Sequence, residues 1–232
     1  GLYRDVNIIG LSESHFDLDY YGGPGIRVTP EIVGEDAKVT VEVYVTNKKE
    51  QQKLDYVLKD GRGNVIAETI GDGTKVVFSI PNVHLWHGRK DPYLYTAEVK
   101  LVEEEQILDN ISTRFGCRSF EIHPDNGFIL NGEEYPLRGV SRHQDRWGLG
   151  NALLKEHHEE DMEYICEMGA NTIRLAHYQH NQYFYDLCDK YGFIVWAEIP
   201  CISEHMPNGR ENTISQMKEL IIQNYNHASI CF

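Results

Sequence analysis

Residues 171–196 read NTIRLAHYQHNQYFYDLCDKYGFIVW, and three different patterns follow one another within this stretch. TIRLAH has the β-prone composition of a short strand. NQYFYDLCDKYG has the spacing of a helix that ends at Gly192, and FIVWAEIP then begins a strongly apolar strand. A strand, a helix and a second strand in this order predict two parallel strands joined by a right-handed crossover.

The same alternation extends in both directions from this stretch. We predict a strand at 137–141 and a helix at 153–170 before it, and a helix at 214–227 and a strand from 228 after it. The core stripe expected on the first helix is Leu154, Met162, Ile165 and Met168. An open doubly wound sheet and a (β/α)8 barrel both fit this order. The chain contains no G-x-G-x-x-G and no phosphate-binding G-K-[ST], so a nucleotide fold lacks its usual support.

The first half of the chain has an all-β pattern. In KVTVEVYVTN (38–47) the valines at 39, 41, 43 and 45 share one face, which is typical of a half-buried strand. Apolar runs separated by Gly, Asn and Asp at roughly ten-residue spacing predict an antiparallel β-sandwich from about Gly23 to Cys117. RDVNIIGL (4–11) is predicted to form a further strand. We therefore divide the chain into residues 1–22, 23–119 and 120–232.

Composition excludes several classes of protein. Lys and Arg number 22 against 36 Asp and Glu, a net charge of −14, which argues against nucleic acid or an anionic membrane as partner. No apolar run approaches the roughly 20 residues of a bilayer span. Five cysteines without a C-x-x-C pair indicate reduced thiols rather than a disulfide framework. The opening GLYRDV lacks an initiator Met and a signal-peptide pattern, so we expect that the chain is a piece of a longer protein. The sequence does not indicate the cellular compartment of that protein.

Polar residues follow the predicted parallel strands where each strand ends. Arg142 and His143 end the first strand, Arg174 and His177 the second, and Glu198 the third, with Glu204 and His205 shortly after. The carboxyl ends of parallel strands carry the site in such folds. Alternatively, Arg142 and Arg174 serve only as ion-pair partners of Asp145 and Glu198. A metal-dependent hydrolase that uses His143, His177, Glu198 and Glu204 is a further alternative. His157 and His158 are expected on a solvated helix face, and Trp86 at an edge of the sandwich.

Here the sequence resembles a known family. Asn171, Arg174, His177, Tyr178, Asp189 and Gly192 match the first signature of glycoside hydrolase family 2, whereas Leu175 and Gln179 depart from it. FILNGEEYPLRGVSRHQD (128–145) resembles the segment that leads into the family's barrel, and GLYRDV resembles the end of its N-terminal sugar-binding β domain. The resemblance implies an immunoglobulin-like β-sandwich followed by the first part of a TIM barrel, and it selects the barrel over the open sheet.

The last residues resemble the start of the family's second signature. Asn226, His227 and Ser229 match it, and the resemblance places the acid/base Glu and the nucleophilic Glu beyond Phe232. We therefore expect no catalytic residue within the chain and no glycoside hydrolysis by the chain alone, because retention of configuration requires both carboxylates. An incomplete barrel also leaves apolar surface exposed. We therefore expect that the chain associates through this surface, that its last strand is poorly ordered, or that other contacts cover the surface. Association of identical chains would give a homo-oligomer.

By the same resemblance, His143 and His177 would hydrogen-bond sugar hydroxyls, Arg174 would hold carboxylates beneath them, and Glu198 would belong to the substrate site. Glu204 is a weak candidate ligand for Mg²⁺ in the longer protein; the chain itself is expected to need no cofactor. RHQD together with SEH resembles the β-galactosidase branch of the family, which implies terminal β-D-galactosides as substrates. One alternative is a β-glucuronidase of the same family, although the Asn-Lys pair that would bind the carboxylate of a uronic acid is not visible here. The other is a non-catalytic carbohydrate-binding or structural module.

Overall fold

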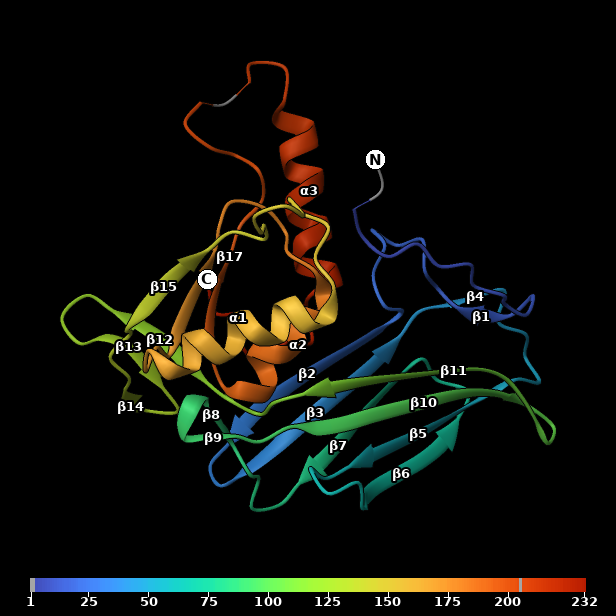
Figure 1. Cartoon of the computed structure of the whole chain (residues 1–232). Helices are drawn as coiled ribbons and strands as arrows, with labels where there is room; N and C mark the ends of the chain where they lie inside the picture. Colours follow the sequence, from blue (N-terminus) through green and yellow to red (C-terminus); the bar gives the residue numbers. More distant parts are fainter. Residues whose placement is uncertain (1–2, 205) are drawn as a thin grey trace.

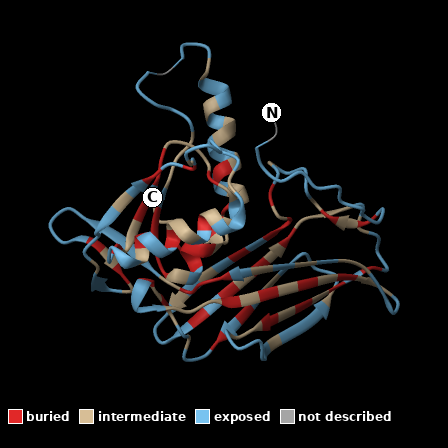
Figure 2. Cartoon of the chain, in the orientation of Figure 1, coloured by how far each residue is buried: buried red, intermediate tan, exposed pale blue. Residues whose placement is uncertain are grey.

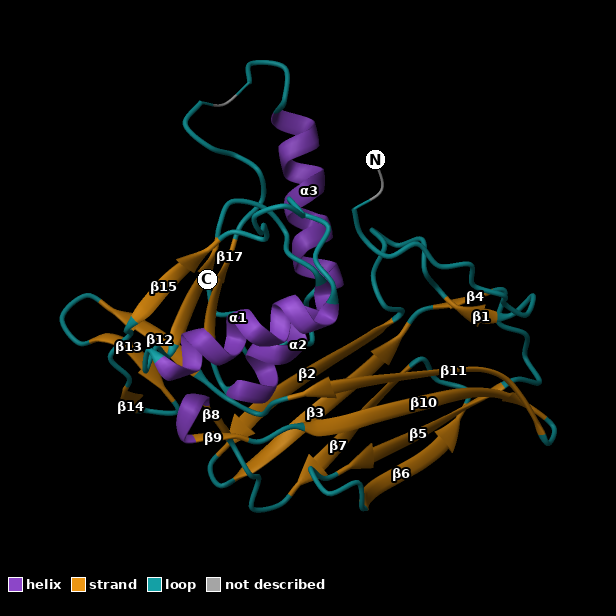
Figure 3. Cartoon of the chain, in the orientation of Figure 1, coloured by secondary structure: helices purple, strands orange, loops and turns teal. Residues whose placement is uncertain are grey.

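The structure is a computed structural model, and it describes residues 3–204 and 206–232. A β-rich unit built from the first half of the chain adjoins an α/β unit from the second half, to which the α-helices belong (Figures 1 and 3). In the described part of the chain, no helix has the length and apolarity needed to cross a bilayer.

Seven strands form the sandwich as one sheet of four and one of three. The larger sheet has the order β11-β10-β5-β6 and the smaller β2-β3-β7, all antiparallel. This 4+3 arrangement confirms the predicted immunoglobulin-like sandwich. The bounds are β2 Ile26–Val33, β3 Asp36–Val43, β5 Lys53–Lys59, β6 Val65–Gly71, β7 Lys75–Ile80, β10 Tyr95–Glu103 and β11 Gln106–Phe115.

The period-2 pattern of the sequence determines the sandwich core. Along β3 the side chains of Val39, Val41 and Val43 are buried, and those of Thr40 and Glu42 between them are more exposed. β5 and β10 alternate in the same way, so apolar side chains from both sheets meet between them. Figure 2 shows these buried residues as red bands along the strands. Each fully buried Val or Leu contributes about 1.5–3 kcal/mol to folding.

Small β elements connect and extend these units. Two short antiparallel pairs and one three-stranded antiparallel sheet lie outside the sandwich, together with one 3-10 turn. The bounds are β1 His15–Phe16 with β4 Val45–Thr46, β8 Trp86–His87 with β9 Asp91–Pro92, η1 Gly88–Lys90, and β12 Phe120–His123, β13 Gly127–Leu130 and β14 Glu133–Glu134.

Three parallel strands with their crossover helices make up the α/β unit. The bounds are β15 Gly139–Arg142, α1 Lys155–Glu167, β16 Thr172–Leu175, α2 Gln182–Tyr191, β17 Ile194–Ala197 and α3 Arg210–Gln223. The strands lie side by side in chain order, and Ile230 continues the series by a parallel bridge to Val195. Chain order without a reversal is the topology of a barrel wall rather than of a doubly wound sheet. The predicted incomplete TIM barrel is therefore confirmed.

Local signals lie at both ends of α2, and the predicted end at Gly192 is confirmed. Asn181 caps the N-terminus, where its side chain accepts a hydrogen bond from the Tyr183 backbone N–H. Gly192 ends the helix with φ 76°, a left-handed conformation that glycine adopts without a side-chain clash. The sequence between these residues therefore specifies a helix of defined length, which directs the chain into β17.

Only two of the four residues predicted to form the buried face of α1 are buried. Met162 and Ile165 are buried, but Leu154 and Met168 are 58% and 69% exposed because they are the residues that flank the helix rather than members of it. The strand predicted at 4–11 is also wrong for its described residues, since this segment has no regular structure and its apolar side chains are exposed. A strand needs a partner for its backbone groups, and the described residues supply none for this segment.

Trp86 joins the two units instead of closing an edge of the sandwich. It is fully buried with Phe128, Leu130, Ile194 and Ala228 in a separate cluster, and its indole N–H donates to the Asp189 carbonyl at 2.9 Å. Arg118 reinforces this junction by donating to the backbone carbonyls of Ala228 and Ile230. The predicted edge role of Trp86 was wrong because hydrophobic patterning does not show which surface covers an apolar residue.

Candidate active site

The carboxyl ends of the parallel strands bring the predicted polar residues to one edge of the sheet. Arg142 is paired in register with Leu175, and Leu175 with Ala197. His143 and Glu198 directly follow β15 and β17, and His177 lies two residues after the end of β16, so all three follow strand ends at the same edge of the sheet. The predicted assembly of three strand ends is present in the structure.

Arg174, His177 and Glu198 form a hydrogen-bonded triad. Arg174 donates from Nε to Glu198 Oε1 at 2.5 Å and from Nη2 to Oε2 at 3.3 Å, a two-pronged contact between a guanidinium and a carboxylate. His177 Nδ1 lies 3.1 Å from Oε2 of the same carboxylate. Partial burial by itself raises the pKa of Glu198, but the hydrogen bonds and charges of Arg174 and His177 outweigh it and lower that pKa below its usual value. Arg174 thus forms the ion pair with Glu198 that the alternative reading expected.

The triad determines which nitrogen of His177 faces outward. His177 Nδ1 faces the ion pair, 3.1 Å from Glu198 Oε2 and 3.0 Å from Arg174 Nη2. Nε2, on the other side of the ring, is then available as a hydrogen-bond partner for a hydroxyl group. The half-buried ring of His177 is held in this orientation at the edge of the sheet.

His143 lies beside His177 at the mouth of this edge. The two rings meet edge to face with centroids 5.0 Å apart, and His143 is solvent-exposed. The next residue, Gln144, donates its backbone N–H to the Tyr178 hydroxyl at 3.1 Å and accepts a hydrogen bond from the Asn181 backbone N–H at 2.6 Å. These contacts tie the loop after β15 to the loop after β16, so the two imidazoles are presented together.

Beneath His143, Arg142 is buried in a polar cluster that the sequence did not reveal. It donates from Nε and Nη2 to Asp161 Oδ2 at 3.0 and 2.6 Å, not to Asp145 as considered from the sequence. Its Nη1 and Nη2 also point at the Nδ1 atoms of His180 and His158, each at 3.1 Å. Burial lowers the pKa of Arg142, opposed by the charge of Asp161. The cluster anchors the residue that precedes His143.

The two adjacent histidines of α1 do not lie on a solvated face as predicted. His157 accepts the backbone N–H of Leu154 at its Nδ1 and so closes the first turn of the helix. His158 is 1% exposed, and burial followed by the Arg142 charge lowers its pKa to about 4. His158 and Asp161 are three residues apart and share a helix face, which is the one sequence signal that could have indicated the cluster.

The described residues bring three potential metal ligands together at one place, and Glu204 is not among them. Glu204 is exposed, and His205 lies outside the described residues. Within 3–204 and 206–232, the one group of three side chains at metal-ligating distances is Asp186, Asp189 and His227. There the Asp189 oxygens already accept from His227 Nδ1 at 2.6 Å and from the Ser229 N–H at 2.8 Å, and Asp186 pairs with Arg114. This group is a hydrogen-bonded ion-pair network.

Neither tryptophan near the site is buried. Trp147 is 99% exposed, and Trp196 is 50% exposed with its ring stacked on Phe232 at a centroid distance of 6.0 Å. Both rings are therefore open to solvent, although Trp196 lies on an otherwise apolar strand.

Comparisons with known proteins place this geometry in a family. A "Beta-glucuronidase" of Bacteroides fragilis is 38% identical over the whole chain, and a "Beta-galactosidase" of Thermoanaerobacter pseudethanolicus is 29% identical over 99% of it. The chain spans 36% and 31% of the lengths of these two relatives.

Solved structures agree with these relatives. An FMN-binding β-glucuronidase from Facaelibacterium prausnitzii L2-6 superimposes with a TM-score of 0.91 at 46% identity, covering 96% of this chain and 35% of that one. A putative β-galactosidase from Bacteroides fragilis gives 0.90 at 38% identity, covering 95% of this chain and 35% of that one. The family descriptions "Glycosyl hydrolases family 2" and "Glycosyl hydrolases family 2, TIM barrel domain" match residues 24–118 and 120–232. The chain belongs to glycoside hydrolase family 2.

Proposed function

We propose that this chain supplies the sugar-binding part of the active site of a retaining β-glycosidase. The observation that carries the proposal is the pairing of His143 with His177 at the carboxyl ends of β15 and β16, where Glu198 orients the second imidazole. Imidazole nitrogens are directional partners for sugar hydroxyls, and hydrogen bonds to these hydroxyls strengthen as the oxocarbenium-like transition state forms.

Glu198 is unsuited to either catalytic carboxylate role. A general acid needs a raised pKa, whereas the pKa of Glu198 is lowered. A nucleophile needs a free oxygen, whereas Arg174 and His177 occupy both oxygens of Glu198. We therefore assign Glu198 and Arg174 to holding His177, and we place the acid/base and the nucleophile in further parts of the longer protein.

The sugar is proposed to be a β-D-glucuronide. Support comes from two similarities, the 38% identical relative and the 46% identical structure, both of which bear the name β-glucuronidase. β-D-Galactosides are the second candidate, favoured by the RHQD and SEH segments and by the β-galactosidase names among the other relatives.

Three smaller proposals accompany this one. Residues 1–22 would end a preceding sugar-binding domain, with the sandwich at 23–119 and the barrel segment from 120. Any Mg²⁺ in the longer protein would have Glu204 as one oxygen ligand, with its remaining ligands from elsewhere. A homo-oligomer would cover the exposed apolar side chains of α3, which are Ile214, Met217 and Ile221.

The test is hydrolysis of aryl β-D-glucuronide and aryl β-D-galactoside by the longer protein, with this chain as the control. We expect activity from the longer protein alone, greater on the glucuronide, and a large loss of kcat/KM for His177→Ala. Turnover by this chain alone would contradict the placement of the carboxylates. No turnover by either protein would favour a non-catalytic carbohydrate-binding module instead.

A further inference from the structure

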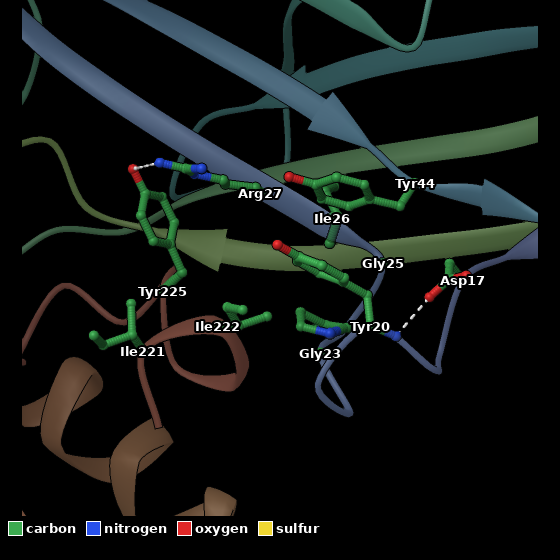
Figure 4. A pocket seen from close by; sticks show the side chains of 11 residues that line it. Asp17, Tyr20, Gly23, Gly25, Ile26, Arg27, Tyr44, Ile221, Ile222 and Tyr225 are labelled. Atoms are coloured by element: carbon green, nitrogen blue, oxygen red, sulfur yellow. Dashed lines mark hydrogen bonds between the residues drawn. The ribbon is translucent and has the colours of Figure 1, made fainter. Parts of the chain in front are cut away.

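A small cavity lies where three separate parts of the chain meet. Residues 17–27 before and within β2, Tyr44 after β3, and the end of α3 enclose about 130 Å³ (Figure 4). A cavity of about 150 Å³ holds one benzene molecule in a protein interior. The space therefore suits a single six-membered ring with a small substituent that extends to solvent.

The walls of this cavity are aromatic and aliphatic. The rings of Tyr20 and Tyr44 stack with centroids 5.6 Å apart and planes at 26°, and Tyr225 lies on the opposite side (Figure 4). Ile221 and Ile222 of the α3 end provide aliphatic surface between them. Flat ring faces together with branched aliphatic groups favour a flat apolar ring over a polar one.

One cation lies in the same cavity. The guanidinium of Arg27 stands 4.1 Å from the centroid of the Tyr225 ring and donates one N–H to the Tyr225 hydroxyl at 3.0 Å. The hydroxyl ends of Tyr20 and Tyr44 point toward it in Figure 4. Among residues 3–204 and 206–232, the ion pairs do not include Arg27, although the chain has 36 acidic residues. Its remaining donors match the geometry of a carboxylate.

The loop that carries Tyr20 is held in place before any ligand arrives. Asp17 Oδ1 accepts the Tyr20 backbone N–H at 2.8 Å, and its Oδ2 accepts the Thr46 hydroxyl at 3.0 Å. A side chain at Gly23 would place its Cβ 2.7 Å from Ile222 Cγ2, so the loop packs closely on the α3 end. A preformed site binds without the cost of ordering its walls.

We propose that this cavity is a binding site for monocyclic aromatic carboxylates, with the ring between Tyr20 and Tyr225 and the carboxylate on Arg27. The site is formed by the junction of the sandwich with α3 and shares no residue with the triad of Arg174, His177 and Glu198. It is therefore independent of the proposed glycosidase activity, and it can be tested with this chain.

Benzoate is the probe for this site, measured by titration calorimetry and by NMR. For a ligand of nine heavy atoms we expect a Kd on the order of 1 mM, with intermolecular NOEs from the ring protons to the methyl groups of Ile221 and Ile222. Benzyl alcohol, which lacks the charge, and cyclohexanecarboxylate, which lacks the flat ring, should each bind at least tenfold more weakly. Equal binding of cyclohexanecarboxylate or of glucuronate would overturn the aromatic class, and NOEs to other residues would overturn the location.

Two variants separate the charge from the ring face. Arg27→Gln should weaken benzoate binding at least tenfold, whereas Arg62→Gln, in the exposed turn between β5 and β6, should leave it unchanged. Tyr20→Leu removes a half-exposed ring and should weaken benzoate and benzyl alcohol alike, with little effect on Tm. If Arg27→Gln binds benzoate as the parent chain does, or if Arg62→Gln loses as much affinity, the proposal is wrong.

Discussion

Arg174 and Glu198 come from adjacent parallel strands, and the guanidinium of the first donates through Nε and Nη2 to both oxygens of the second. This contact fixes the position of the Glu198 carboxylate. It also lowers the pKa of Glu198, although partial burial alone would raise it, so the carboxylate stays charged. His177 Nδ1 faces this ion pair, with Glu198 Oε2 at 3.1 Å and Arg174 Nη2 at 3.0 Å. The orientation of the His177 imidazole therefore depends on the Arg174–Glu198 ion pair. The pair can have this role without contacting a sugar.

Glu198→Ala should change the tautomer balance of the His177 ring. Without the carboxylate, Nδ1 keeps only the Arg174 donor as its neighbour in the triad, so the Nε2–H form becomes favoured. The ¹⁵N chemical shifts of the imidazole measure this directly in the present chain. Glu204→Ala removes an exposed carboxylate further along the same loop and should leave these shifts unchanged. Unchanged imidazole shifts in Glu198→Ala would show that the carboxylate does not determine the tautomer of the ring.

The fold was largely predictable because its signals are local. The valines of β3 and the Asn181 and Gly192 ends of α2 specify their elements through neighbouring residues alone. The failures at Leu154 and at residues 4–11 concern packing partners. Neither hydrophobicity nor β-propensity says whether another element covers a side chain, so these errors could not be removed by reading the same pattern more closely.

The candidate site was predictable only at its rim. His143, His177 and Glu198 follow apolar strands, and strand ends in parallel sheets meet at one edge. A buried polar cluster lies behind this rim, formed by Arg142, His158, Asp161 and His180. Arg142 and His180 in this cluster are 38 positions apart in the sequence. Such pairings depend on how α1 and α2 pack on the sheet, which composition and spacing do not determine.

Asp189 and Asp186, three residues apart on α2, should differ in their contribution to stability. Asp189 is buried and holds both His227 and the Ser229 N–H, whereas Asp186 pairs with Arg114 at an exposed position. We expect Asp189→Asn to lower the free energy of unfolding by about 2–3 kcal/mol, because a buried ion pair loses one partner. Asp186→Asn should cost about 1 kcal/mol or less. Urea denaturation of both variants makes the comparison, and equal losses would contradict a structural role for the Asp189 network.

The pH dependence of stability should reveal the buried histidines beside Arg142. Burial lowers the pKa of His158 to about 4 and that of His180 to about 3, and the Arg142 donors facing their Nδ1 atoms disfavour protonation further. In the unfolded chain these imidazoles take up protons near pH 6.5, and in the folded chain they do not. Stability is therefore retained above pH 6.5 and lost as the pH falls from 6.5 toward 4, by up to about 1.4 kcal/mol per pH unit for each histidine.

Unfolding free energies of the parent chain and of His158→Gln, measured between pH 4 and 7, test this expectation. The variant should have a shallower slope in that window, by the amount that one histidine contributes. His227 should not interfere, because the charge of Asp189 and their hydrogen bond outweigh burial and raise its pKa, so its contribution falls only as the pH rises above 6.5. Parallel slopes for the two proteins would mean that His158 is protonated in the folded state.

Arg118 should control the stability of the last segment of the chain. Its half-buried guanidinium donates to the carbonyls of Ala228 and Ile230. Val195 of β17 donates its backbone N–H to the Ser229 carbonyl at 2.8 Å. The segment is thus held both by backbone hydrogen bonds with β17 and by the Arg118 side chain, which satisfies two of its carbonyls.

Arg118→Met keeps the aliphatic stem but leaves both carbonyls without these donors. We expect amide hydrogen exchange at residues 228–232 to accelerate at least tenfold, which corresponds to about 1.4 kcal/mol, while amides of β5 and β10 keep their protection. Arg138→Met changes an exposed arginine at the start of the same unit and should alter neither set. Acceleration in both sets would indicate general destabilisation, and no acceleration at 228–232 would show that β17 alone holds the segment.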